Sequence, residues 1–548
     1  MSRNQSLLYK TIREATAVRD HSPNIAIADY WVIKRTGCAG FHPVHPPEIL
    51  MPIHEGQNGL SISRRSFLRT GTLTAAAVPA FSAWSVDASN ADALSEHATQ
   101  HAFDQNPDFL KSAKGAALWI ESAQRQGPKG VYWLPEPDHP EKTTTVSAPN
   151  AIYSGSAGTV LFFIQLAQAT GEARYLDTAS LGADYLVDTW RDLVDKPSEG
   201  LLSSPGLNLS LYGGLAGMAF VLNETGKATG NTKYREAAKA ATDYIVQAAK
   251  PAGAGIAWSG APGIAGDGSI ILYLLYAARE FQNDRYRAVA EQAGDRVLEL
   301  GIKEPRGGFS WRGFPQFPGL PKDAYFPNFE GGTAGVAYVF ARLYGETGKA
   351  KHLYAAKQGA LHLQSIATLH GNAALIPYRL PDLSDLYYLG YCHGPAGTAR
   401  TFFELHKITH ETEYQVWTER LAQGIVQSGI PENLTPGYWN VVCQCCGSAA
   451  VIDLFVGLWA STGRQDYLTF AQRVAKQLAS RETNPDGKGN RWYQAWTRVK
   501  PWEVTAETGY SIGASGVGAA LLHVHLAEQG KYRAILLPDN PFASTRQA

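Results

Sequence analysis

The sequence has no excess of charge of either sign, because 49 Lys and Arg residues balance 49 Asp and Glu residues. It also lacks a basic stripe with interleaved aromatic residues, so nucleic acid is not an expected partner. No stretch reaches the ~18 uninterrupted apolar residues of a membrane-spanning helix. We therefore expect no membrane insertion of the processed chain. Methionine and cysteine are scarce, with three and five residues.

Glycine, tryptophan and apolar side chains are abundant. Of 548 residues, 54 are Gly and 13 are Trp, and 45% are hydrophobic against 18% charged, a composition too apolar for a disordered chain. One domain per ~150 residues would give three or four domains. That rule fails for solenoids and toroids, which grow by adding repeats, so internal repeats decide the domain count.

The N-terminal region carries the pattern of an export signal. Arg64 and Arg65 are followed by Phe67-Leu68 and by a weakly apolar run over residues 70–83. This order of features resembles a twin-arginine signal, whereas an ordinary basic helix start would not require it. The pattern predicts the Tat export machinery as a partner and a periplasmic or extracellular location.

The limits of this signal can be placed approximately. We expect the signal peptide to cover residues 51–88, with cleavage after Ala88, although Ala80 also fits. A leader of about sixty residues before the arginine pair would be unusual, so we expect translation to start at Met51. Residues 1–50, with Cys38, would then not belong to the protein, and residues 89–548 would form the mature domain.

One motif recurs seven times after residue 150. A glycine, two residues and a small residue precede a strongly apolar run of helical length, and the leading glycines are 49 to 69 residues apart. This spacing accommodates two helices per repeat. The leading glycines are Gly155, Gly214, Gly263, Gly332, Gly394, Gly447 and Gly513.

The second helix of each pair has its own signature. A Thr-Gly turn is followed by an aromatic residue four positions after the glycine, as in Gly171 with Tyr175, Gly230 with Tyr234 and Gly463 with Tyr467. The first helix of each pair is apolar on most sides and the second is amphipathic. These features predict an all-α fold, a double-layered α/α toroid of seven helical hairpins. A first outer helix is expected around residues 108–125.

Four cysteines lie at two consecutive glycine turns. Cys392 precedes His393-Gly394, whereas Cys445 and Cys446 precede Gly447, with Cys443 close by. Three thiolates at one level of a ring suit zinc and leave a fourth position for water or substrate. A disulfide of Cys443 with Cys446 or Cys392 is the alternative in an exported chain.

These motifs together resemble the lanthionine synthetase C-like proteins. The resemblance rests on the seven glycine turns, on YCHGPAG over residues 391–397 and on CCG over residues 445–447, and it covers about residues 110–535. It implies that Cys392, Cys445 and Cys446 bind Zn²⁺. It also implies that zinc activates a substrate thiol, which adds to a dehydroamino acid to form a thioether before a proton reaches the enolate.

The chain departs from the family at the acid and base positions. Gly331 occupies the place of the family's catalytic His, Ser210 lies at or near the place of an Asp, and Tyr388 stands where an Arg is expected. The nearest replacements are His393 and Glu330, which we take as the candidate catalytic residues. Each also has a purely structural interpretation, for Glu330 a carboxylate at a helix start.

Three functions remain open from the sequence. The first is a zinc enzyme acting on a peptide or a small-molecule thiol. The second is an exported carbohydrate-active toroid, favoured if a carboxylate pair lies in a cleft. The third is an inactive binding protein stapled by zinc, with Cys443 as fourth ligand. Candidate residues for the carbohydrate cleft are Trp311, Tyr325, Phe329, Asp382, Asp385, Trp439 and Trp492.

Overall fold

The computed structural model describes residues 107–140, 149–195, 206–313, 323–381, 385–433, 435–495, 498 and 500–547, which all fall in one compact unit. The predicted export signal over residues 51–88, with Arg64 and Arg65, lies outside the described residues. Residues 1–50 with Cys38 lie outside them as well. None of the helices described is both long enough and apolar enough to cross a membrane.

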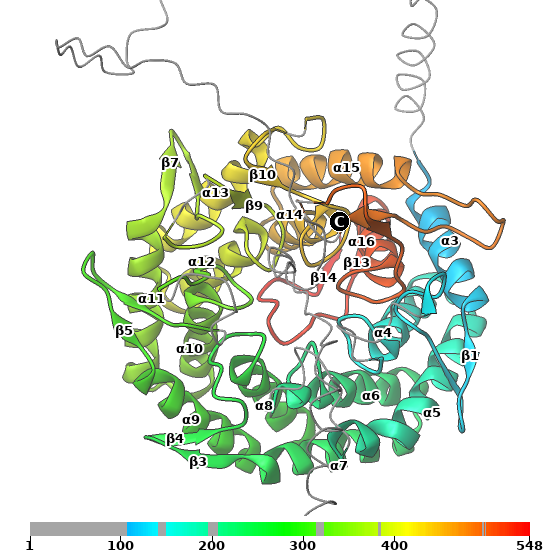
Figure 1. Cartoon of the computed structure of the whole chain (residues 1–548), viewed down its shortest axis with the longest axis horizontal. Coiled ribbons are helices and arrows are strands. Elements are labelled where there is room, and N and C mark those ends of the chain that lie inside the picture. The colour runs from blue at the N-terminus through cyan, green and yellow to red at the C-terminus, as the bar shows by residue number, and fades with distance from the viewer. Residues whose placement is uncertain are drawn as a thin grey trace, which may run out of the picture. The chain divides into compact units, whose positions relative to one another are not determined.

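Seven apolar helices form the inner layer of a ring (Figure 1). Each has 15 residues, begins directly after a glycine and is buried over most of its length. An inner helix contacts both of its neighbours and the outer layer, so it needs apolar residues on nearly every side. The inner helices are α4 (Ser156–Thr170), α6 (Leu215–Thr229), α8 (Asp267–Phe281), α10 (Thr333–Thr347), α12 (Pro395–Thr409), α14 (Ser448–Thr462) and α16 (Ala514–Glu528).

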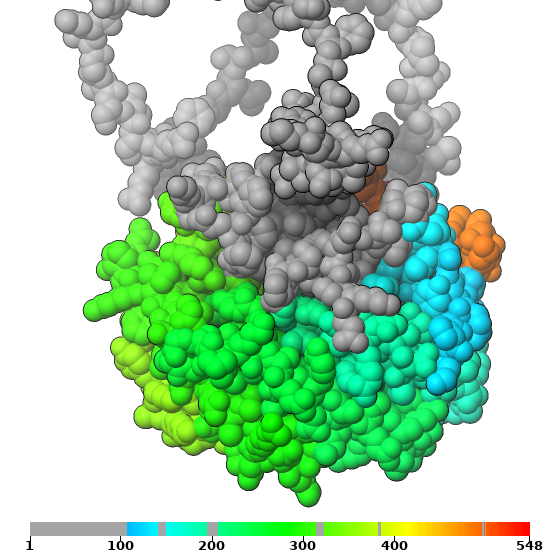
Figure 2. Space-filling view, turned by 60° about the horizontal axis from the view of Figure 1, so that its bottom comes forward, coloured from blue at the N-terminus to red at the C-terminus, as the bar shows by residue number. Residues whose placement is uncertain are grey.

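Seven amphipathic helices form the outer layer, which makes a continuous wall from the cyan to the green segments in Figure 2. Six of them follow their inner partner in sequence and pack on it, whereas α16 packs on α3, the first outer helix. The ring is thus closed by the two ends of the described chain, which confirms the predicted toroid and the helix near residues 108–125. The outer helices are α3 (Phe109–Ser122), α5 (Ala173–Asp195), α7 (Thr232–Ala248), α9 (Asp284–Glu299), α11 (Ala350–Ile366), α13 (Thr412–Gln427) and α15 (Gln465–Ser480).

The third repeat begins later than predicted. The N-cap of α8 is Gly266, not Gly263. The Asp267 carboxylate accepts hydrogen bonds from the backbone N–H groups of Trp258, Ser259 and Gly260 and so fixes the start of the helix. With Gly266 as the leading glycine, the repeat spacing narrows to 52 to 66 residues.

The turns into the outer helices agree with the predicted signature. Gly171, Gly230 and Gly463 adopt left-handed φ angles of 72°, 70° and 79°, a conformation that costs other residues roughly 1–2 kcal/mol. The aromatic residues that follow are buried. The hydroxyl of Tyr234 donates to Asp184 of the preceding outer helix at 2.7 Å, so this position also links neighbouring repeats.

Short two-stranded sheets occur in the segments that connect the helices or follow the last one, and they were not predicted from the sequence. In the part of the chain that the structure describes, six are antiparallel and one is parallel. The antiparallel pairs are β1 (Arg125–Gln126) with β2 (Val131–Tyr132), β3 (Lys250–Ala252) with β4 (Gly255–Ala257), β5 (Ile302–Lys303) with β6 (Phe309–Ser310), β7 (Thr368–His370) with β8 (Ala373–Leu375), β11 (Gln494–Ala495) with β12 (Val504–Thr505), and β13 (Lys531–Arg533) with β14 (Thr545–Gln547). The parallel pair is β9 (Tyr387–Tyr388) with β10 (Tyr438–Trp439).

A buried tryptophan ties several outer helices to the chain that follows them. Trp133, Trp258 and Trp311 come directly after a hairpin, and each indole N–H donates to a carbonyl in the last turn or so of the preceding outer helix at 2.7–2.9 Å. Trp492 does the same to Leu478 O at 2.8 Å. Trp311 and Trp492 are therefore structural residues, and the prediction that they line a cleft is wrong.

The C-terminal segment crosses the interior of the ring, as the red trace in Figure 1 shows. It carries Asp539, which is fully buried and accepts hydrogen bonds from the hydroxyls of Tyr212 and Tyr391. Arg400 of α12 faces the same carboxylate at 3.8 Å. Since Tyr212 precedes α6 and Tyr391 precedes α12, Asp539 joins the second and fifth repeats.

Replacing Asp539 with alanine is expected to lower the free energy of unfolding by about 3 kcal/mol, because it leaves a buried guanidinium and two buried hydroxyls without their acceptor. Chemical denaturation would measure the change. The control is Asp466→Ala, which removes an exposed carboxylate paired with Arg464 and should cost no more than about 1 kcal/mol. Equal effects of the two changes would contradict the assigned role of Asp539.

Candidate metal centre

The turns that precede the inner helices are joined by a belt of backbone hydrogen bonds. In each link, an N–H group of one turn donates to a carbonyl of the next turn at 2.8–3.1 Å. The belt therefore holds residues from distant parts of the sequence at one level of the ring. Its links run from Ala265 to Glu330, from Glu330 to Cys392, from Cys392 to Cys445, from Cys445 to Ser511, from Ser511 to Tyr153 and from Tyr153 to Tyr212.

Most belt residues share one position, two residues before the leading glycine of their turn. That position holds Tyr153, Tyr212, Glu330, Cys392, Cys445 and Ser511. Alignment of the seven turns on their glycines would have revealed this set from the sequence. The sequence prediction found Glu330, Cys392 and Cys445 but missed Tyr153.

The parallel pair β9–β10 brings the fifth and sixth turns together, because both strands lead directly into them. The two backbones then approach so closely that a Cβ on Gly390 would lie 2.4 Å from the carbonyl carbon of Cys446. A side chain at residue 390 would force the turns apart. Glycine at this position therefore allows thiols from both turns to converge.

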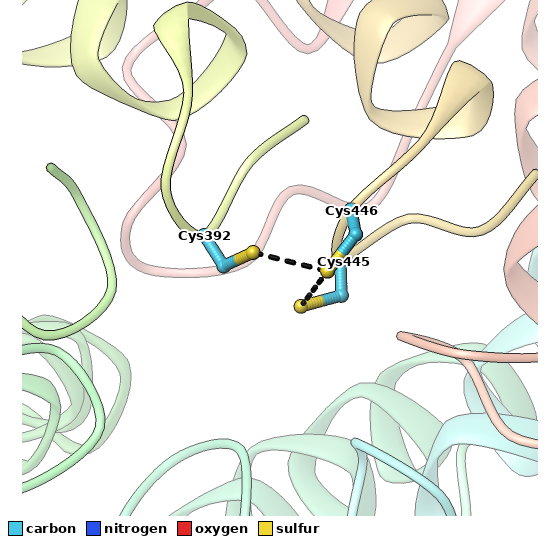
Figure 3. A group of neighbouring side chains, drawn as sticks. All are labelled: Cys392, Cys445 and Cys446. Carbon is cyan, nitrogen blue, oxygen red and sulfur yellow. Dashed lines mark hydrogen bonds between the residues drawn. The ribbon is translucent and has the colours of Figure 1, made fainter. Parts of the chain in front are cut away.

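The three predicted cysteines converge as expected. Figure 3 shows their side chains pointing toward one another from the two turns. The Sγ atom of Cys446 lies 3.2 Å from that of Cys392 and 3.5 Å from that of Cys445, and all three side chains are buried. Their sulfurs lie within 4.8 Å of one another. These cysteines are free thiols, as the spacing requires, since a disulfide bond measures about 2.05 Å.

This donor set fits a zinc ion. Zinc–sulfur bonds of about 2.3 Å in a tetrahedral site place two sulfurs roughly 3.8 Å apart, close to the spacing found here. Cys443 is buried but does not join the cluster; its sulfur accepts the N–H of Cys446 at 3.4 Å. The cluster can therefore hold a metal with three protein ligands, and Cys443 is not a fourth.

The electrostatics of the cluster favour ionisation of Cys445 over that of the other two thiols. Burial raises the pKa of Cys392 and of Cys446 well above the usual value. Burial acts in the same direction on Cys445, but hydrogen bonds from Cys392, Cys446 and Tyr153 outweigh it and lower the pKa of this thiol. Ionisation of all three thiols would require a cation among them.

Glu330 carries a buried carboxyl group beside the cluster. One of its oxygens is within 4.8 Å of ligand atoms of Cys392 and His393, and Oε2 has no hydrogen-bond partner. Burial, reinforced by the nearby charge of Cys445, raises the pKa of Glu330 well above its usual range. Glu330 therefore lies beside the thiol of Cys392, and its catalytic role stays a prediction.

His393 is also adjacent, but its surroundings are aromatic. The imidazole is buried and lies 5.0 Å from the ring of Phe326 and 5.1 Å from that of Tyr378, measured between centroids. Burial lowers the pKa of His393 to about 3, so the ring is neutral at ordinary pH. An imidazole with so low a pKa is a weak base that is almost never protonated near neutral pH, so it is a poor proton donor.

The sequence comparison decides the family. The family model described as lanthionine synthetase C-like protein matches residues 146–537, well over half of the chain. The chain belongs to the lanthionine synthetase C-like family. No match to a curated protein sequence was found.

The fold is similar to that of a solved structure, nisin cyclase. Nisin cyclase superposes with a TM-score of 0.51 at 14% identity, over 71% of this chain and 91% of that chain. An unsaturated glucuronyl hydrolase specific for heparin has a TM-score of 0.40 at 11% identity, over 77% and 97%. An α-1,6-mannanase of Salegentibacter sp. has a TM-score of 0.37 at 13% identity, over 60% and 90%.

Ser210 and Tyr388, two of the predicted departures from the family pattern, make structural contacts. Ser210 is buried and its hydroxyl accepts the N–H of Gly213 at 3.3 Å. Tyr388 is fully buried and stacks on Tyr378, with ring centroids 4.4 Å apart. Gly331 brings no side chain. Polar side chains next to the thiols come instead from Glu330 and Tyr153.

The residues predicted for a carbohydrate cleft are not brought together. Phe329 is fully buried in the core, as are Trp311 and Trp492. Asp385 is exposed, and Asp382 lies outside the described residues. Tyr325 and Trp439 are partly buried, the former with its hydroxyl 2.9 Å from His362 Nε2.

Proposed function

We propose that this lanthionine synthetase C-like protein is a zinc-dependent enzyme that adds a thiol to a dehydroamino acid in a peptide and so forms a thioether. The observation that carries the proposal is the convergence of three buried thiols with a buried carboxyl group, one oxygen of which has no hydrogen-bond partner. Cys392, Cys445 and Cys446 would hold the zinc ion. When bound, zinc stabilises a substrate thiol as its thiolate and leaves it nucleophilic.

The protein's own residues would supply position and a proton. In the reaction a carbon–sulfur bond forms at the β-carbon, the thiol gives up its proton and the α-carbon gains one, so no oxidant or reductant is needed. Glu330 is the proposed proton donor because its buried carboxyl group lies beside the thiol of Cys392. His393 is the second candidate for proton transfer, because a nitrogen of its ring lies within 4.8 Å of ligand atoms of Glu330 and Cys392.

Competing interpretations have less support. A purely structural zinc site would need a fourth protein ligand, and Cys443 does not provide one. A carbohydrate-active site would need the predicted aromatic residues at a cleft, and three of them are core residues.

A zinc enzyme is also compatible with the twin-arginine pattern at Arg64 and Arg65, since the twin-arginine route exports proteins that have already folded around a metal. Export to the periplasm or beyond remains a proposal from the sequence.

The proposal is tested by metal content and by a thiol-addition assay. We expect one zinc per chain, and chelation should expose three additional reactive thiols. With the zinc-loaded protein, a model peptide containing a cysteine and a dehydroalanine should lose its free thiol without a change in mass. Alkylation of the remaining thiols followed by mass spectrometry detects this loss. A mass increase with an added small thiol would instead identify intermolecular transfer. Absence of metal from the purified protein would overturn the proposal.

A further inference from the structure

One belt residue with no role assigned above touches a proposed zinc ligand. The hydroxyl of Tyr153 donates a hydrogen bond to the Sγ atom of Cys445 at 3.3 Å. The Tyr153 side chain is largely buried, and its hydroxyl therefore meets the sulfur in a water-poor setting. A hydrogen bond to a charged acceptor is worth about twice a neutral one in such surroundings.

The scaffold fixes the position of this hydroxyl. The N–H of Tyr153 donates to Tyr212 O at 2.9 Å, and its carbonyl accepts from Ser511 N at 2.9 Å, so the belt clamps the residue on both sides. Ser511 lies between Tyr153 and Cys445 in the belt. Because serine is small, the long tyrosine side chain can reach past the seventh turn to the sixth.

Other tyrosines at the same level have different partners. The hydroxyls of Tyr212 and Tyr391 donate to Asp539, and the hydroxyl of Tyr510 accepts from Gln165 at 3.3 Å. These groups are also buried tyrosines in the turns, but the hydrogen bonds of their hydroxyls go to Asp539 and Gln165 and not to the thiols. The contact with Cys445 is thus particular to Tyr153 among these four residues.

We propose that Tyr153 is a positioning residue of the metal centre, whose hydroxyl holds the Cys445 sulfur in place and takes up part of its negative charge. The inference rests on the proposed zinc site. Hydrogen bonds to a ligand orient it and tune its donor strength, and their loss typically weakens metal binding 10- to 100-fold. Tyr153 therefore controls how firmly, and with how much charge, Cys445 holds the cation.

The experiment compares cobalt(II) binding by the full chain and by its Tyr153→Phe and Tyr510→Phe variants. Cobalt replaces zinc and reports on sulfur ligands through a sulfur-to-cobalt charge-transfer band. For Tyr153→Phe we expect about tenfold weaker binding and a shift of this band to longer wavelength, because a thiolate without its hydrogen bond gives up an electron more easily. Tyr510→Phe should match the unmodified protein in both measurements.

The outcomes distinguish failure of the proposed metal site from failure of the proposed role of Tyr153. If Tyr153→Phe binds cobalt with unchanged affinity and an unchanged band, the role of Tyr153 is overturned while the metal site stands. If the unmodified protein binds neither cobalt nor zinc, the metal site and the role of Tyr153 both fail. Phenylalanine fills the same space as tyrosine, and an unchanged circular dichroism spectrum verifies that the variant is folded.

Discussion

Replacement of Cys392 by alanine is expected to abolish stoichiometric zinc binding and all thiol-addition activity. Cys392 is the fifth repeat's contribution to the cluster, and its sulfur lies 3.2 Å from that of Cys446. The remaining pair, Cys445 and Cys446, comes from a single turn and cannot enclose the ion. We expect the affinity for zinc to fall by more than about 100-fold, the upper range for loss of a supporting contact.

The measurement is zinc content after dialysis, together with the melting temperature with and without chelator. A bound metal stabilises the folded state, so chelation should lower the melting temperature of the unmodified protein and leave that of the Cys392→Ala variant unchanged. The matched control is Cys443→Ala, which removes a buried thiol outside the cluster and should retain one zinc per chain. Stoichiometric zinc in Cys392→Ala would refute the ligand assignment.

Replacement of Glu330 by glutamine is expected to reduce turnover by about 100- to 10,000-fold, the range for loss of a general acid or base. The amide has the shape of the carboxyl group but cannot deliver the same proton. Because Glu330 is not one of the three proposed ligands, the variant should keep its zinc. The expected signature is a large fall in kcat with little change in KM.

The control for this variant is Glu404→Gln. Glu404 has nearly the same burial as Glu330, at 3% and 2% exposure, but it lies within α12 and pairs with Lys407 at 2.6 Å. Its replacement should affect stability rather than turnover per folded molecule. A Glu330→Gln variant with normal turnover would eliminate Glu330 as proton donor.

Most helices and turns of the ring could be predicted because the sequence patterns that specify them are local. A glycine before each inner helix, a left-handed turn after it and a change from uniformly apolar to amphipathic helices all depend on residues close in sequence. The error at Gly263 arose because the true start of α8 is set by Asp267, whose carboxylate binds the N–H groups of a preceding loop. A glycine pattern alone does not show that capping.

The candidate site was only partly predictable. Cys392, Cys445 and Cys446 stood out because cysteine is rare in this chain and their turns are consecutive. Tyr153 did not stand out, since it lies 292 positions from Cys445 in sequence and reaches it only when the first and seventh turns become neighbours. Trp311 and Trp492 were misjudged because aromatic residues near loops can serve a cleft or a core equally well.

The sequence by itself determined the repeat number, the helical toroid and the choice of the three cysteines, because each follows from spacing and residue type at the turns. Only the tertiary structure decided that α16 pairs with α3, that Asp539 joins the second and fifth repeats, and that Glu330 and Tyr153 face the thiols. The physical reason is ring closure. Closure and the belt of backbone hydrogen bonds place residues hundreds of positions apart at one level, and no local pattern encodes that proximity.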